Sequence, residues 1–121
     1  MSKILIIEDE PDTAKVVARR LTQGGFEVVV AVDAYEGVKL AHKERPDLII
    51  LDLMLPAGGG VSVLEKIRMS ADIRTTPVVV LTGSKNEDYK QRIIDQGVEA
   101  YLEKPYEPDV LISTIQEILN K

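Results

Sequence analysis

The segment Asp47-Leu48-Ile49-Ile50-Leu51-Asp52-Leu53-Met54-Leu55-Pro56 is the most informative part of the sequence for the fold. Four consecutive apolar residues lead into Asp52, and a proline follows four residues later. A short apolar run of this kind is typical of a strand that is buried on both faces of a parallel sheet. Ligands of open α/β sheets bind at the carboxyl ends of the strands. Asp52 is therefore a candidate site residue, although an Asp at this position also suits a plain loop cap.

Four further runs are short, aliphatic and rich in β-branched residues, which predicts strands. They cover 3–7, 28–32, 78–81 and 98–102. Between the runs, apolar residues recur three or four positions apart and predict amphipathic helices. Strand and helix thus alternate five times along the chain. Such alternation favours right-handed crossovers and an α/β fold in which helices cover both faces of a parallel sheet.

Local signals mark where the helices begin. Pro11 and Pro108 suit the first position of a helix, and Asp33 is a suitable N-cap. Ser84 with Glu87 has the spacing of a capping box, so we expect the fourth helix to begin near Ser84. The glycine-rich stretch 56–60 is expected to be a flexible loop beside Asp52.

The composition limits the classes of function. A chain of 121 residues is expected to be one domain, 1–121, with one core. Cysteine is absent, which excludes disulfides and thiolate chemistry and permits a reducing cytoplasm, where we expect this protein. The net charge of −5 disfavours direct nucleic-acid binding by this chain. No apolar run is long enough to span a membrane.

Polar groups follow four of the five expected strands. They are Glu8, Asp9, Asp52, Thr82 and Lys104. If all strands are parallel, these groups share one edge of the sheet. Carboxylates about 4 Å apart repel by roughly 4 kcal/mol per pair at an effective dielectric constant near 20, so they must take up a proton or a cation. Magnesium prefers such oxygen ligands, and the lack of neighbouring His or Cys argues against zinc or copper.

The same set of groups suits phosphoryl transfer to an aspartate. An oxygen of Asp52 would attack in line, a metal and Lys104 would neutralise the phosphoryl oxygens, and the Thr82 hydroxyl would donate to one of them. Gly83 would leave room for the group. The alternative is that Lys104 only pairs with the acids as a buried cation.

The chain resembles the CheY-like receiver domain of two-component response regulators along essentially its whole length. The motifs that carry the resemblance are Ile-Leu-Ile-Ile-Glu-Asp-Glu-Pro at 4–11, Leu-Asp-Leu-Met-Leu-Pro at 51–56, Val-Leu-Thr at 80–82 and Lys-Pro-Tyr at 104–106. The resemblance implies a single-domain, doubly wound (βα)5 sheet of the flavodoxin-like type, with strand order 2-1-3-4-5.

The resemblance also implies roles for particular residues. Asp52 would be the phosphoacceptor, taking its phosphoryl group from a histidine kinase or a histidine phosphotransfer protein. Mg²⁺, or Mn²⁺ in its place, would be bound by Asp52, by Asp9 directly, by Glu8 through water and by the Met54 carbonyl. Thr82 and Lys104 would contact the phosphoryl oxygens, and the Lys104–Pro105 peptide bond would be cis.

A conformational switch is part of the same resemblance. Thr82 would move toward the phosphoryl group and Tyr101 would turn inward, which would alter a face made by 84–96, 98–102 and 108–119. That face would bind a downstream protein target or form a homodimer. The chain would act on no substrate other than its own phosphoryl group.

The sequence departs from the family pattern at several positions. Gly59 stands where members often have Asp, and neither Ala100 nor 111–115 carries the charges typical of the winged-helix transcription factors of the family. Met54 and Ser84 lie where the family tunes the rate of dephosphorylation.

Two other functions, a phosphatase and a pseudo-receiver, fit the sequence less well. A magnesium-dependent aspartyl phosphatase would need a second Asp two residues after Asp52, where Met54 stands. A pseudo-receiver that binds partners without phosphorylation would not need all five polar groups. His42 lies among charged residues, so we expect it to be a solvated surface residue rather than a phosphate carrier.

Overall fold

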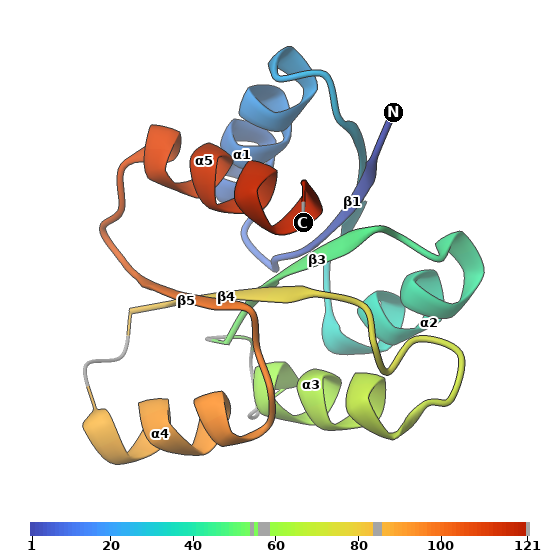
Figure 1. Cartoon of the computed structure of the whole chain (residues 1–121), viewed down its shortest axis with the longest axis vertical. Helices are drawn as coiled ribbons and strands as arrows, with labels where there is room; N and C mark the ends of the chain where they lie inside the picture. The colour runs from blue at the N-terminus through green and yellow to red at the C-terminus, as the bar shows by residue number, and fades with distance from the viewer. Residues whose placement is uncertain (54, 56–58, 84–85, 121) are drawn as a thin grey trace.

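The protein is an open parallel sheet with helices on both faces (Figure 1). The structure is a computed structural model, and it describes residues 1–53, 55, 59–83 and 86–120. The strands are β1 (Lys3–Ile7), β2 (Glu27–Ala31), β3 (Leu48–Asp52), β4 (Val78–Thr82) and β5 (Ala100–Glu103). The helices are α1 (Pro11–Gln23), α2 (Ala34–Glu44), α3 (Gly59–Met69), α4 (Glu87–Asp95) and α5 (Pro108–Leu119).

The strand order is β2-β1-β3-β4-β5, and every strand pair is parallel. Helices α1 and α5 cover one face, and α2, α3 and α4 cover the other (Figure 1). The order and the alternation confirm the expected flavodoxin-like fold. Because all strands point the same way, their carboxyl ends lie along one edge of the sheet, beside the polar groups that follow them.

The core has two layers, one on each face of the sheet. Every residue of β3 and of β4 is buried, as expected for strands covered on both sides. Alternate side chains of these strands enter the two layers: Ile49 and Leu51 pack under α2 and α3, and Leu48 and Ile50 pack under α1 and α5. The carboxyl edge of the sheet is therefore supported by central strands that are packed on both faces.

Three sequence predictions about local structure were wrong. Helix α4 begins at Glu87, and its N-cap is Asn86, whose side chain accepts a hydrogen bond from Tyr89 N–H at 3.0 Å. The expected capping box at Ser84 places the helix start too early, and Ser84 itself lies outside the described residues. An Asn that directly precedes the first turn supplies the acceptor in its place.

The other two wrong predictions concern the glycine-rich stretch 56–60 and the limits of the edge strands. Gly59 and Gly60 are helical and buried in the first turn of α3, whereas 56–58 lie outside the described residues. Strand β2 ends at Ala31 because its partner β1 ends at Ile7. Strand β5 likewise begins at Ala100, opposite Val79. Pairing with a neighbour, rather than composition, sets where each edge strand starts and stops.

The remaining expectations at helix ends agree with the structure. Pro11 and Pro108 open α1 and α5, and the Asp33 carboxylate accepts from Glu36 N–H at 2.8 Å at the start of α2.

His42 is exposed at the end of α2, where its Nδ1 lies 2.8 Å from a carboxylate oxygen of Asp72. In the described part of the chain, no helix has the length and apolar character required to span a lipid bilayer.

Candidate functional site at the carboxyl edge of the sheet

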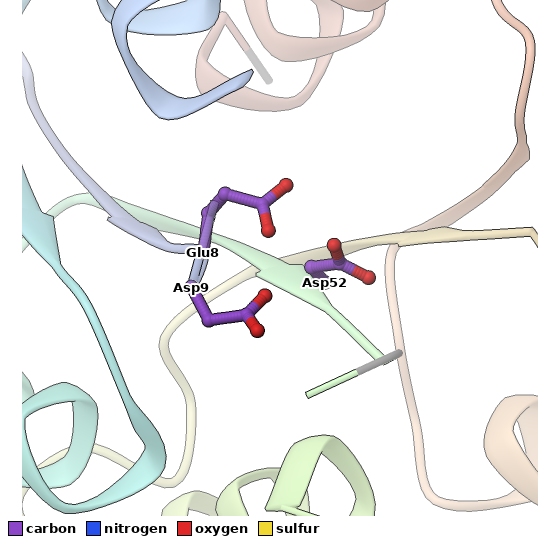
Figure 2. A group of neighbouring side chains, drawn as sticks. All are labelled: Glu8, Asp9 and Asp52. Atoms are coloured by element: carbon purple, nitrogen blue, oxygen red, sulfur yellow. The ribbon is translucent and has the colours of Figure 1, made fainter. Parts of the chain in front are cut away.

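Three carboxylates meet at the carboxyl edge of the sheet. Glu8 and Asp9 follow β1, Asp52 ends β3, and Figure 2 shows the three side chains close together at this edge. Each offers a carboxylate oxygen, and these oxygens all lie within 4.8 Å of one another. Glu8 and Asp52 are both only 4% exposed. The structure therefore brings together acids from two segments that are more than forty residues apart in the chain.

Main-chain hydrogen bonds hold the segments that carry these groups. Glu8 N–H donates to the Ala31 carbonyl at 3.0 Å, which continues the pairing of β1 with β2 past its last residue. Lys104 N–H donates to the Thr82 carbonyl at 2.8 Å, which does the same for β5 and β4. The polar side chains are thus placed by extensions of the sheet rather than by free loops.

Lys104 reaches across the edge to the acids. Its Nζ lies 2.9 Å from Asp52 Oδ2 and 3.7 Å from Glu8 Oε1. Burial lowers the pKa of Lys104, but the hydrogen bond from its ammonium to Asp52, the charge of Asp52 and the charge of Glu8 outweigh burial, and the net effect is a raised pKa. Lys104 therefore stays charged, and its ammonium pairs with two of the three carboxylates, Asp52 and Glu8.

The buried position of Glu8 and its nearness to Asp52 raise the pKa of its carboxyl group. Burial is the largest cause of a rise in the pKa of Glu8 to about 7, and the hydrogen bond and charge of Asp52 add to it. Glu10 N–H, which donates to Glu8 Oε2 at 3.3 Å, and the Lys104 charge act in the opposite direction. Without a further cation, Glu8 therefore ionises only as the pH rises through about 7.

The donor set fits a hard divalent cation. It consists of carboxylate oxygens, as Mg²⁺ prefers, and neither His nor Cys belongs to this group of described residues. A divalent cation bound by these oxygens would favour the ionised form of Glu8 over the protonated form. The Met54 carbonyl, which the resemblance implies as another ligand, lies outside the described residues.

Thr82 and Tyr101 lie on the same face of neighbouring strands. Tyr101 pairs with Val80, and Thr82 follows Val80 by two residues, so the two side chains are diagonal neighbours. Thr82 is fully buried, and the Tyr101 hydroxyl oxygen is buried without a hydrogen bond to the described residues. Burial is the main cause of the raised pKa of Tyr101; the Thr82 hydroxyl partly offsets it, although the pair lacks hydrogen-bond geometry.

Tyr106 is a further neighbour of the site, to which the sequence analysis gave no role. Burial raises the pKa of its phenol, and the charges of Lys104, Glu8 and Asp52 also act on it. The Lys104–Pro105 peptide bond, which directly precedes Tyr106 in the chain, is cis. The only signal in the sequence was that Tyr106 stands two positions after Lys104.

Comparisons with known proteins agree with this geometry. The family model described as the response regulator receiver domain matches residues 4–116. The phosphate regulon transcriptional regulatory protein PhoB of Escherichia coli is 34% identical over 119 residues, which cover 98% of this chain and 52% of PhoB. The chain thus spans about half the length of this curated relative.

Two solved structures share the fold over nearly the full length of both chains. The chemotaxis response regulator CheY4 of Vibrio cholerae is 31% identical, with a TM-score of 0.89 and coverage of 98% of each chain. The receiver domain of the sensor histidine kinase PA1611 of Pseudomonas aeruginosa is 28% identical, with a TM-score of 0.89, coverage of 99% of this chain and 98% of that one, and a magnesium ion in its active-site cleft. The match over 4–116, the fold and the acidic edge together show that this chain belongs to the response regulator receiver family.

Proposed function

We propose that this chain is a phosphorylatable receiver domain that spans 1–121 and accepts a phosphoryl group on Asp52. The donor is a phosphohistidine of a kinase or of a histidine phosphotransfer protein. The observation that carries the proposal is the position of Asp52: its carboxylate lies 2.9 Å from the Lys104 ammonium, and its oxygens lie within 4.8 Å of carboxylate oxygens of Glu8 and Asp9.

The transfer makes one bond and breaks one. An Asp52 oxygen attacks phosphorus and forms a P–O bond while the P–N bond to the partner's imidazole breaks, and the electron pair of that bond stays on nitrogen. Lys104 neutralises charge on the phosphoryl oxygens, and the Thr82 hydroxyl donates to one of them. Asp52, Asp9, Glu8 and the Met54 carbonyl would hold Mg²⁺, or Mn²⁺ in its place, which supplies further charge neutralisation when bound.

The test is phosphoryl uptake from a small donor. We expect the chain, incubated with Mg²⁺ and acetyl phosphate, to gain the mass of one phosphoryl group, and we expect Asp52→Asn to abolish the gain. Asp47→Asn is the matched control, because Asp47 lies at the opposite end of β3, where its carboxylate accepts from Lys3 N–H. Absence of a mass gain in the wild-type chain would contradict the proposal.

Magnesium binding separates this function from a phosphorylation-independent scaffold. We expect Asp9→Asn to weaken Mg²⁺ binding measured by calorimetry, because it removes one of three converging carboxylates. Asp12→Asn, in the first turn of α1 and outside that group, is the control. Equal affinity in wild type and Asp9→Asn would favour a scaffold, and turnover of an organic phosphate would favour a phosphatase.

We infer that Thr82 and Tyr101 form the switch that reports phosphorylation. Their diagonal placement supports this role, because movement of Thr82 toward Asp52 changes the packing around the buried Tyr101 hydroxyl. Helix α4 contacts the same tyrosine: Lys90 Nζ lies 5.4 Å from the ring centroid and 3.9 Å from a Glu103 carboxylate oxygen. A shift of Tyr101 therefore reaches the α4-β5-α5 face directly.

The α4-β5-α5 face would pass the signal to a downstream protein target or to a second copy of the chain. Because PhoB is a transcriptional regulator of about twice this length, control of transcription through such contacts is one output. We propose that the chain works in the cytoplasm and that it does not itself bind nucleic acid.

The test of this switch is the response to beryllofluoride, which mimics the phosphoryl group. We expect beryllofluoride with Mg²⁺ to shift the NMR signals of α4 and β5 in wild type but much less in Thr82→Ala. Thr75→Ala, in the exposed loop before β4, is the control. Equal shifts in α4 for wild type and Thr82→Ala would contradict the role of Thr82.

A further inference from the structure

Gly60 allows α3 to touch the main chain directly after Asp52. Gly60 is the second residue of α3 and is buried. A β-carbon at this position would lie 2.5 Å from Leu53 Cα, 2.7 Å from the Leu53 carbonyl oxygen and 2.8 Å from the Leu53 carbonyl carbon. All three are main-chain atoms, which cannot turn away as the end of a flexible side chain can.

The residue that Gly60 contacts is held from the other side as well. Leu53 directly follows Asp52, and its N–H donates to the Leu81 carbonyl of β4 at 3.0 Å. Its side chain is 3% exposed and belongs to the core layer beneath α2 and α3. The backbone that orients Asp52 is therefore enclosed between β4 and the first turn of α3.

We propose that Gly60 is a positioning residue for Asp52, an inference that rests on the proposed function. Carbon atoms in contact are normally about 3.5–4.0 Å apart, so a methyl group at Gly60 requires Leu53 and α3 to separate by about 1 Å. A displacement of this size at a reacting group can cost about 100-fold in rate. The separation would move Asp52 from Lys104 and from the acids with which it shares a cation.

Gly59 supplies a matched contrast in the same helical turn. A β-carbon there would lie 3.2 Å from Ala34 Cβ and 3.4 Å from Leu55 Cβ. These contacts are tight, but a shift of a few tenths of an ångström relieves them, and none of the three nearest atoms belongs to the main chain beside Asp52. Gly59→Ala and Gly60→Ala should raise the helix propensity of α3 by similar amounts, so a comparison of the two variants isolates the contact with Leu53.

The experiment compares wild type, Gly59→Ala and Gly60→Ala. Calorimetric titration gives the Kd for Mg²⁺, mass spectrometry gives the rate of phosphoryl uptake from acetyl phosphate at saturating Mg²⁺, and circular dichroism gives the folded fraction. We expect Gly60→Ala to raise the Kd at least about tenfold and to slow uptake by a similar or larger factor. Gly59→Ala should change each quantity less than about threefold.

The outcomes separate the positioning role from a purely structural one. Gly60→Ala that melts at a lower temperature but keeps the wild-type Kd and rate would overturn the inference, and so would equal losses in both variants. If Gly60→Ala does not fold in buffer, trimethylamine N-oxide is added to all three proteins to restore folding before the titrations. Failure of the wild-type chain to bind Mg²⁺ or to take up phosphoryl would instead contradict the proposed function.

Discussion

Each end of the parallel sheet holds a partly buried cation, Arg68 at one end and Lys104 at the other. The two cations differ in the number of carboxylates around them and in their other hydrogen-bond partners. At the amino end, Arg68 of α3 has a side chain that is 17% exposed. Its guanidinium donates to the carbonyl oxygens of Gly97, Arg74 and Thr76 at 2.6–3.0 Å and to Glu99 at 3.4 Å. Every N–H direction of the group has an acceptor, and one carboxylate balances its charge.

At the carboxyl end, the balance is reversed. Lys104 pairs with Asp52 and Glu8, and Asp9 adds a third carboxylate beside these two. Burial, followed by the neighbouring Asp52, raises the pKa of Glu8 to about 7. The amino end therefore joins α3 to the loops around β4 and β5, whereas the carboxyl end keeps unbalanced charge that a cation can neutralise. The contacts around Arg68 thus favour stability at one end of the sheet, and the candidate ligand site lies at the other end.

The largest expected effect is at the amino end. Arg68→Ala should lower the free energy of unfolding in urea by roughly 2–4 kcal/mol, because it leaves several carbonyl oxygens and Glu99 without their donor. Arg68→Lys should recover only part of this loss, since an ammonium cannot reproduce the planar fork of donors. Arg74→Ala, with an exposed side chain in the same loop, is the control. A loss below about 0.5 kcal/mol would erase the contrast between the two ends.

The second effect is the pH dependence at the carboxyl end of the metal-free protein. The pKa of Glu8 is about 7 in the folded chain against 4.5 unfolded, so the folded state binds the proton more tightly. The contribution of Glu8 to stability is therefore fully present below pH 4.5 and is lost as the pH rises through 7. The size of this loss is roughly 1–3 kcal/mol.

The measurement for Glu8 is urea unfolding with a chelator present at several pH values. The free-energy difference between wild type and Glu8→Gln should move in favour of Glu8→Gln as the pH rises from 4.5 to 7, because the amide cannot ionise. Glu36→Gln, at the start of α2, is the control. A difference that stays constant with pH would show that Glu8 does not titrate in this range.

The third effect is the response to Mg²⁺. At a free concentration ten times the Kd, Mg²⁺ should raise the free energy of unfolding by about 1.4 kcal/mol. Arg68→Ala, which is far from the acids, should keep this increment, and Asp9→Asn should reduce it at the same concentration. Equal increments in wild type and Asp9→Asn would show that the cation binds elsewhere.

The smallest effect is at an exposed ion pair that belongs to neither end of the comparison. The hydrogen bond from His42 lowers the pKa of Asp72, and Arg45 adds to the effect. A lowered pKa in the folded state means that the stabilisation is present above the ordinary Asp value of 3.8 and is lost as the pH falls through the folded-state pKa. His42→Asn should therefore lower the melting temperature slightly at neutral pH and not at all at pH 2; a larger loss in acid would contradict this sign.

Sequence reasoning predicted the site better than it predicted the helix ends. Asp52 and Thr82 each follow a run of apolar residues, and parallel strands bring such positions to one edge whatever the loops do. The start of α4 was missed because Ser84 and Asn86 are both suitable N-cap residues, and the sequence does not show which of them caps the helix. In the structure Asn86 is the N-cap, and Ile93 of the same helix is buried in the core.

Glycine roles were the least visible from the sequence. Gly59 and Gly60 belong to a glycine-rich stretch that predicted a loop, but both lie in α3, where Gly60 faces the backbone of Leu53. Gly37 of α2 is also buried, but a β-carbon there would meet a side chain rather than the main chain, because it would lie 2.8 Å from Ile7 Cδ1. Such close approaches depend on where a helix crosses the sheet, which local composition does not encode.

The alternation of strands and helices, the parallel sheet and the residues at its carboxyl edge could all be predicted from the amino-acid sequence. Each of these follows from the spacing of apolar and polar residues along the chain. Four features required the folded structure: the distances among the carboxylates, the pairing of Lys104 with Asp52, the contacts of Arg68 and the approach of Gly60 to Leu53. These depend on how distant segments pack, because burial and separation in space set the energies of charges and contacts.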